Sequence, residues 1–246
     1  MASKQTAFVT GANKGLGFEI SRALCSRGYK VYVGARDAAR GQAAVDKLKA
    51  AGGDAAWIAL DTGDRASIES AVGRIASEVD ALDVLVNNAG TFVESWVTPP
   101  STVTDAQMRE TMEVNFFGPF ALLHACAPLL TKSRGARVVN ISSDMGSLAN
   151  VNNPQSIVYG VLAPAYQCSK VAINALTVLY AKEWKDTPHK INSASPGWAK
   201  TDMGTDAAPL TVAEGADTAI WLATLPADGP SGEFFSATRT RGAMEW

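Results

Sequence analysis

Tyr166 and Lys170 stand four residues apart, in a stretch whose apolar residues recur at helical spacing. Residues four apart share one face of a helix, which brings the phenol and the ammonium close together. A free phenol has a pKa near ~10, and a neighbouring ammonium favours the phenolate and lowers that value. We therefore expect Tyr166 to transfer a proton with the help of Lys170. The spacing alone also fits an ordinary polar pair on a helix surface.

A glycine-rich turn near the N-terminus indicates a phosphate site. A short apolar run ends at Thr10, glycines follow at positions 11, 15 and 17, and a helical pattern then starts with Ile20 and Leu24 on one face. The first N–H groups of a helix lack partners within the helix, and the helix dipole favours an anion there. The spacing G-x-x-x-G-x-G differs from the usual dinucleotide fingerprint G-x-G-x-x-G. A glycine-rich turn without a ligand therefore remains an alternative.

Composition excludes several classes of function. The chain has 246 residues, 47% of them hydrophobic and 19% charged, with a net charge of -2. This balance shows no basic surface for nucleic acid and no expected membrane span. Cys25, Cys126 and Cys168 lie far apart, which indicates free thiols in a reducing, cytoplasmic setting. His124 and His189 match no triad or metal spacing, so we expect no metal site.

Strand-like and helix-like runs alternate along the whole chain. Strands are expected at residues 7–10, 30–34, 55–60, 83–86, 137–141, 191–194 and 233–236. Long helices are expected at residues 37–51, 64–79, 104–130 and 164–185, the third beginning at a Thr104–Gln107 capping box and bent or ended by Pro119 and Pro128. Strands joined by helices pair in parallel, and their unbroken apolar cores indicate a sheet covered on both faces. We predict one α/β domain over residues 1–246, a Rossmann-like doubly wound parallel sheet of about seven strands.

Several motifs in register carry a family resemblance. They are Thr10-Gly11-x-x-x-Gly15-x-Gly17, Asn87-Asn88-Ala89-Gly90, Asn115, Ser143, Tyr166-x-x-x-Lys170 and Pro196-Gly197-x-x-x-Thr201. Over nearly its whole length the chain resembles the short-chain dehydrogenase/reductase family. The most similar subgroup is the NADPH-dependent carbonyl reductases, through Gly-Ala-Asn-Lys-Gly at 11–15, Ala35-Arg36-Asp37, Asn115-Phe116-Phe117-Gly118, Pro196-Gly197-Trp198, Thr201-Asp202-Met203 and residues 232–246.

The resemblance implies a catalytic set of Asn115, Ser143, Tyr166 and Lys170. Tyr166 would donate a proton to the substrate oxygen, Ser143 would hold that oxygen, and Asn115 would hold a water that links Lys170 to solvent. Ser142 competes with Ser143, because successive residues alternate in direction at a strand end; the resemblance favours Ser143. The implied cofactor contacts are Gly11, Asn13, Lys14, Gly15, Leu16, Gly17, Arg36, Arg40, Asp61, Thr62, Asn88, Ala89, Gly90, Tyr166, Lys170, Pro196, Gly197, Trp198 and Thr201.

Cofactor choice depends on the end of the second strand. An NAD enzyme places a carboxylate there for the ribose 2′-hydroxyl, and this position holds Ala35, followed by Arg36. Arg36, Lys14 and Arg40 could surround a 2′-phosphate, because arginine binds phosphate through paired hydrogen bonds. Asp37 argues against this unless it caps the following helix. We therefore predict NADP as the cofactor.

An apolar pocket is expected beside the catalytic set. The resemblance places Ser143 at the substrate oxygen and Trp198 and Met203 against the substrate. Met145, Trp96 and Tyr159 are further candidates, and each of the apolar and aromatic candidates could equally fill the core. Such a pocket suits hydrophobic aldehydes, ketones or quinones. An insert at about 146–162 would lie beside this site and could cover a helix face used for assembly, so both a monomer and a homo-oligomer remain open.

The function predicted from the sequence is an NADPH-dependent carbonyl reductase with Tyr166 as proton donor. Two alternatives stay open: an NAD-linked alcohol dehydrogenase of the same family, and a dinucleotide-binding sensor without catalysis.

Overall fold

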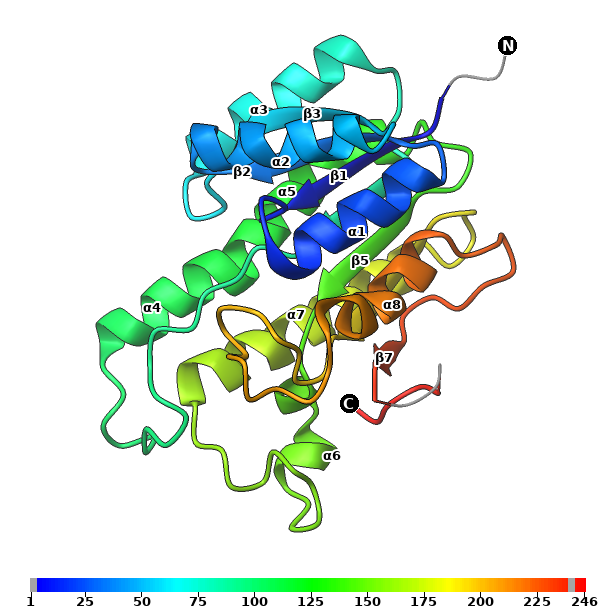
Figure 1. Cartoon of the computed structure of the whole chain (residues 1–246). Coiled ribbons are helices and arrows are strands. Elements are labelled where there is room, and N and C mark those ends of the chain that lie inside the picture. Colours follow the sequence, from blue (N-terminus) through cyan, green and yellow to red (C-terminus); the bar gives the residue numbers. More distant parts are fainter. Residues whose placement is uncertain (1–3, 239–241) are drawn as a thin grey trace.

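One parallel sheet organises the chain, for which the computed structural model describes residues 4–238 and 242–246 (Figure 1). Its strand order among these residues is β3-β2-β1-β4-β5-β6-β7, and every neighbouring pair is parallel. The strands are β1 (Thr6–Thr10), β2 (Lys30–Ala35), β3 (Asp54–Ala59), β4 (Val84–Asn87), β5 (Arg137–Ile141), β6 (Lys190–Ser195) and β7 (Phe234–Ser236). The predicted doubly wound fold is confirmed.

Helices cover both faces of the sheet. They are α1 (Gly15–Ser26), α2 (Ala38–Ala50), α3 (Arg65–Glu78), α4 (Asp105–Met112), η1 (Glu113–Phe117), α5 (Gly118–Leu130), η2 (Asp144–Gly146), α6 (Leu148–Val151), α7 (Pro164–Glu183) and α8 (Val212–Ala223). Side chains of α1, α2 and α8 share one buried cluster with the sheet, and those of α3, α5 and α7 share the other. The predicted capping box of Thr104 with Gln107 is present, and Thr211 forms a second one with Glu214 at the start of α8.

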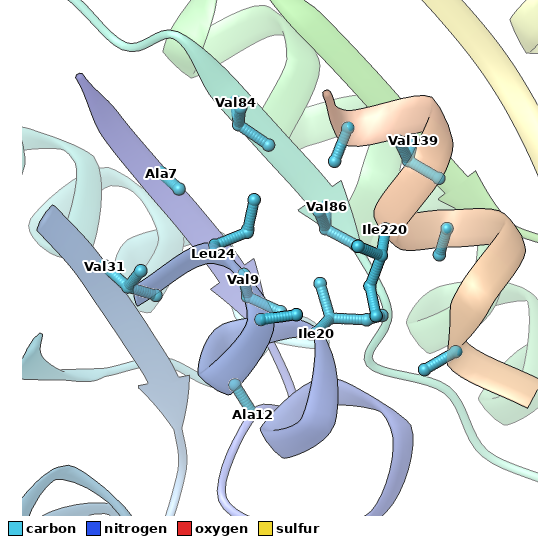
Figure 2. Packing of buried hydrophobic residues seen from close by; sticks show 14 of the residues in the cluster. Ala7, Val9, Ala12, Ile20, Leu24, Val31, Val84, Val86, Val139 and Ile220 are labelled. Carbon is cyan, nitrogen blue, oxygen red and sulfur yellow. The ribbon is translucent and has the colours of Figure 1, made fainter. Parts of the chain in front are cut away.

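Alternation along β1 divides the core between these two faces. Ala7 and Val9 pack with Ile20, Leu24 and the other members of the first cluster (Figure 2), whereas Phe8 points into the second. All three strand residues are completely buried. An inner strand of a covered sheet is apolar at every position for this reason, which explains the unbroken apolar run read from the sequence.

The long helix predicted over 104–130 is one continuous run with a change of winding. Residues 113–117 form the π-helix η1 between α4 and α5, so the change comes before Pro119, which lies in the first turn of α5. Pro128 is tolerated inside α5, two residues before its end. The prediction that the prolines alone would bend or end the helix is corrected in this respect. Wider turns of this kind are frequently found at functional sites.

The same run corrects the expectation that the chain holds no apolar segment of membrane-spanning length. Asp105–Leu130 is long and apolar enough by length and composition, with a mean hydropathy of 1.2 over its most apolar window. Half of that window is buried inside the fold. Leu122, Cys126 and Leu130 are fully buried and face the second cluster, which is the environment of a core helix.

The order in which strands are added to the sheet switches from one side of β1 to the other. Strands β2 and β3 lie on one side of β1, and β4 to β7 lie on the other. Ligands of open parallel sheets bind outside the carboxyl ends of the strands at such a switch point. The glycine turn follows β1 and Asn88–Gly90 follows β4, so both flank this crevice.

Candidate active site

The glycine turn is built against the loop that follows β4. Thr10 Oγ1 accepts the backbone N–H groups of Asn88 and Ala89, both at 2.9 Å. A Cβ on Gly17 would lie 2.5 Å from Asn88 Nδ2 and 2.6 Å from the carbonyl oxygen of Gly11. Gly11 itself has φ of +61°, a conformation that disfavours other residues. The turn therefore requires glycine at both positions.

Asn88 supports this turn with its side chain. Its Nδ2 donates to the carbonyl oxygens of Thr10 at 2.8 Å and Gly11 at 3.2 Å. The resemblance implied a cofactor contact for Asn88, and the structure shows its amide nitrogen bonded to the turn. Asp61 is similar, since its carboxylate accepts from the N–H of Gly63 at 3.0 Å. Contacts of either residue with a cofactor stay predictions.

The N-terminus of α1 is the phosphate-binding candidate in this turn. Its N-cap residue is Lys14, whose side chain makes no capping hydrogen bond, and its first turn contains no acidic side chain. The free N–H groups at this helix end suit an anion. These residues therefore fit the pyrophosphate of a dinucleotide.

Tyr166, Lys170 and Ser143 converge at the carboxyl end of β5. The Tyr166 and Lys170 side chains are buried on α7, with Lys170 Nζ 5.3 Å from the centre of the phenol ring. The Ser143 hydroxyl lies close enough to the Tyr166 phenol to lower its pKa. Ser142, the competing serine, is buried and lies against the carbonyl oxygen of Lys170 at 3.5 Å. Of the two serines, only Ser143 is placed beside the phenol.

Burial dominates the protonation of this pair. It raises the pKa of Tyr166 to about 12, while the neighbouring Ser143 hydroxyl acts in the opposite direction. Burial also lowers the pKa of Lys170 to about 8. The expectation of a lowered tyrosine pKa is corrected, because the net pKa of Tyr166 is raised and desolvation is its largest cause. Lys170 Nζ meanwhile donates to the carbonyl oxygen of Ile141 at 2.8 Å.

Asn115 lies in η1 and joins three segments of the site. Its Oδ1 accepts from the N–H of Thr91 at 2.8 Å, and its Nδ2 donates to Thr91 O and to Ser169 Oγ, each at 3.0 Å. A Cβ on Gly90 would lie 3.4 Å from Asn115 Oδ1 and 3.9 Å from Lys170 Nζ. The two side chains thus border the same small space beside Gly90, where the predicted water would lie.

The chain matches the family model for short chain dehydrogenase over residues 5–209. This match includes the glycine turn, the polar groups after β4 and β5, and the Tyr166–Lys170 pair. The chain belongs to the short chain dehydrogenase family. It is therefore an oxidoreductase, and the resemblance stated from the motifs is confirmed.

Relatives of this short chain dehydrogenase match it over nearly its full length. Carbonyl reductase [NADPH] 1 of Bos taurus is 36% identical over 100% of this chain and 99% of its own. (+)-Neomenthol dehydrogenase of Arabidopsis thaliana is 34% identical over 94% of this chain and 95% of its own. Among solved structures, the NADPH-bound carbonyl reductase from chicken fatty liver is 27% identical with a TM-score of 0.85, covering 99% of each chain.

The segment after β6 lies across the glycine turn of this dehydrogenase. A Cβ on Gly15 would lie 3.6 Å from Thr201 Cγ2, and Lys14 forms an ion pair with Asp202. The segment is also held internally, since the Trp198 indole N–H donates to Gly204 O at 2.6 Å. This segment, which we call the strap, therefore lies over the glycine turn that fits the pyrophosphate of a dinucleotide. It contains Pro196, Gly197, Trp198 and Thr201. Their individual cofactor contacts remain predictions.

Asp37, which counted against NADP, caps α2. Its Oδ1 accepts the N–H of Arg40 at 2.8 Å, and its Oδ2 lies 3.5 Å from Arg40 Nε. These hydrogen bonds lower the pKa of the Asp37 carboxyl. Arg36 and Arg40 are both exposed just beyond β2. The capping role foreseen for Asp37 is confirmed.

An apolar cluster surrounds Tyr166. Tyr166 packs with Met145, Val158 and Ala163, and Met203 contacts the same cluster. Val158 belongs to the insert at 146–162, so this segment lies beside the tyrosine. Trp198 and Tyr159 are about half exposed, at 49% and 50%. Met145 and Met203, two of the predicted substrate residues, thus lie beside Tyr166, and Trp198 lies in the strap.

Sequence reasoning missed Phe92 and Glu94, which follow β4. The Phe92 ring meets the Tyr166 ring edge-on at 5.5 Å and stacks on Trp96 at 4.1 Å. The buried Glu94 carboxylate accepts the backbone N–H groups of Ala165 and Tyr166. One signal was available, because Ala163 precedes α7 and has no capping side chain. A helix start without a local cap needs an acceptor from elsewhere.

Proposed function

We propose that this protein is an NADPH-dependent carbonyl reductase that acts on hydrophobic aldehydes, ketones or quinones with Tyr166 as proton donor. The observation that carries the proposal is the buried Tyr166 beside the Ser143 hydroxyl and Lys170 Nζ, at the same edge of the sheet as the N-terminus of α1. The relatives named carbonyl reductase [NADPH] support the same reaction and cofactor.

The cofactor would be held by the glycine turn, the strap after β6 and the basic residues beyond β2. When bound, NADPH supplies a hydride for the carbonyl carbon. Arg36, Arg40 and Lys14 carry the positive charge that a 2′-phosphate needs, and Ala35 leaves no carboxylate at the position that selects NAD. Asp37 does not oppose this assignment, since its carboxylate is engaged in capping α2.

Tyr166 gives its proton to the carbonyl oxygen as the carbon receives the hydride, so an alcohol forms and a phenolate remains. The raised pKa of Tyr166 keeps the phenol protonated at neutral pH, which suits an acid in the reductive direction. Ser143 orients the oxygen and stabilises the phenolate by donating a hydrogen bond. Lys170 carries a positive charge below its pKa of about 8, which favours the phenolate and supports its reprotonation.

The apolar cluster supports the proposed substrate class. Met145, Val158 and Met203 border Tyr166 together with Phe92. A carbonyl with a hydrophobic substituent would place its oxygen at the phenol and its apolar part against these side chains.

The test is the Tyr166→Phe variant. It removes only the hydroxyl, so NADPH binding measured by fluorescence should stay within about twofold, while kcat should fall more than about a hundredfold. Activity is measured with a panel of aldehydes, diketones, quinones and keto esters and with both cofactors. Full activity of this variant would refute the proposal. If the wild type binds NADPH but reduces no carbonyl of the panel, the sensor alternative is favoured.

A further inference from the structure

A buried glutamate from the loop after β4 holds the first turn of α7. Glu94 Oε1 accepts the Tyr166 N–H at 2.7 Å, and Oε2 accepts the Ala165 N–H at 3.1 Å. Glu94 is 7% exposed. Both of its oxygens thus accept hydrogen bonds from the backbone of Tyr166 and its neighbour. Hydrogen bonds to a carboxylate are about twice as strong as neutral ones, and a negative charge is favoured at a helix N-terminus.

The helix lacks a cap of its own at this end. Ala163 occupies the N-cap position and has no side-chain capping bond, and Pro164 has no N–H to satisfy. A local serine or threonine cap would fix the start of the helix only. A carboxylate from another loop also fixes the distance between that loop and Tyr166, so its role extends beyond capping.

The loop that carries Glu94 contacts the other parts of the site. Thr91 exchanges two hydrogen bonds with Asn115, and the Phe92 ring lies edge-on to the Tyr166 ring. Further along, the carbonyl oxygen of Trp96 accepts the N–H of Leu162 in the insert at 2.9 Å. The segment 91–97 therefore connects Asn115, Tyr166 and the insert.

We propose that Glu94 is a positioning residue for the reduction. By holding the Tyr166 backbone it fixes the position of the phenol relative to Ser143. The Tyr166 hydroxyl is then in place to contact the substrate's carbonyl oxygen. Misplacement of a reacting group by about 1 Å can cost about a hundredfold in rate. This inference rests on the proposed function, because it assigns importance to the place of Tyr166 as proton donor.

The experiment compares Glu94→Gln with Glu214→Gln in the full chain. Glutamine keeps the size of the side chain but has one acceptor oxygen, and its amide group would face an N–H. Glu214 is the matched control, since its carboxylate completes the capping box of α8 far along the chain from Tyr166. Each variant is assayed for kcat, KM, NADPH affinity by fluorescence, the solvent deuterium isotope effect on kcat, and stability in urea.

We expect kcat of Glu94→Gln to fall about tenfold or more, with NADPH affinity within about twofold and a larger solvent isotope effect, because proton donation becomes slower. Glu214→Gln should lose stability without these changes. A kcat and isotope effect for Glu94→Gln equal to those of the wild type would overturn the inference.

A second variant separates positioning from helix capping. Ala163→Ser in the Glu94→Gln background supplies a local cap, and it also restores stability if Glu94→Gln folds poorly. Recovered stability with kcat still low supports the positioning role. Recovery of kcat together with stability would show that Glu94 is a cap alone. The proposed function is judged separately: if Tyr166→Phe abolishes turnover while Glu94→Gln has no effect, only the positioning role fails.

Discussion

At the scale of single residues, the site depends on burying groups that prefer water. Lys170 is 5% exposed and Tyr166 7%, and the strand that ends at Ile141 supplies a carbonyl oxygen to the ammonium. Burial lowers the pKa of the lysine and raises that of the tyrosine, so at neutral pH the phenol holds its proton. Burying these groups in low-dielectric surroundings lowers the stability of the fold. In the same surroundings, a charge that forms during the proposed reaction interacts strongly with its neighbours.

This arrangement makes stability depend on pH. The pKa of Lys170 is about 8 in the folded protein and 10.5 without burial, so between these values the unfolded chain binds the extra proton. Its contribution therefore makes the protein more stable as pH rises from about 8 to about 10.5. Tyr166 acts oppositely, since its pKa rises from 10.0 to about 12 and the folded state holds the extra proton above pH 10.

The Lys170→Met variant should lack the increase in stability with pH that the buried lysine causes. The difference in unfolding free energy between the wild type and this variant should change by on the order of 2 kcal/mol between about pH 7 and pH 10, in favour of the wild type. Urea denaturation without cofactor across this range measures it. Lys182→Met, an exposed change on the same helix, serves as the control, and a Lys170→Met difference that stays flat with pH would contradict the buried-lysine account.

At the scale of helices and strands, the turn between β3 and α3 is packed against the junction of η1 and α5. A Cβ on Gly118 would lie 2.5 Å from the backbone carbonyl oxygen of Thr62. The backbone cannot give way there as a flexible side chain could. Asn115 lies three residues before Gly118, so this contact helps to fix the π-helix that carries it.

Gly118→Ala should therefore destabilise the protein by about 1–3 kcal/mol, through overpacking. Gly73→Ala is the matched control, because Gly73 lies within α3 with nothing within 4 Å of the added Cβ, and it should stabilise by about 0.5–1 kcal/mol. Both are measured by urea denaturation, and equal effects of the two changes would refute the close approach at Gly118.

Local patterns foretold most of the elements and the residues that converge on the site. Periodicity located the strands and long helices to within a few residues, and the Tyr166–Lys170 spacing required only a helix. The π-helix at 113–117 was not foreseen, since the sequence signal there is two prolines and the winding depends on packing. Glu94 was missed because its partners are backbone N–H groups about 70 residues away. The pKa of Tyr166 was misjudged because spacing gives the neighbour of a group and not its burial.

At the scale of the whole molecule, the predicted cofactor site draws on segments at the carboxyl ends of several strands. The glycine turn follows β1, Arg36 follows β2, Asn88 follows β4 and the strap follows β6. The Lys14–Asp202 ion pair joins the first and last of these segments. A ligand that contacts all of them links distant parts of the sheet, so its binding should stabilise the fold as a unit.

NADPH at about one hundred times its Kd should stabilise the protein by about 2.7 kcal/mol, which corresponds to a rise of about 5–10 °C in Tm for a chain of this size. The Arg36→Asp variant should lose much of this rise with NADPH and little of the rise with NADH, because the new carboxylate repels a 2′-phosphate and accepts a ribose hydroxyl. Thermal unfolding with each cofactor at the same concentration measures both effects. Equal losses for NADPH and NADH would mean that Arg36 acts on a part common to both, and the assignment of the 2′-phosphate to this side of the sheet would fail.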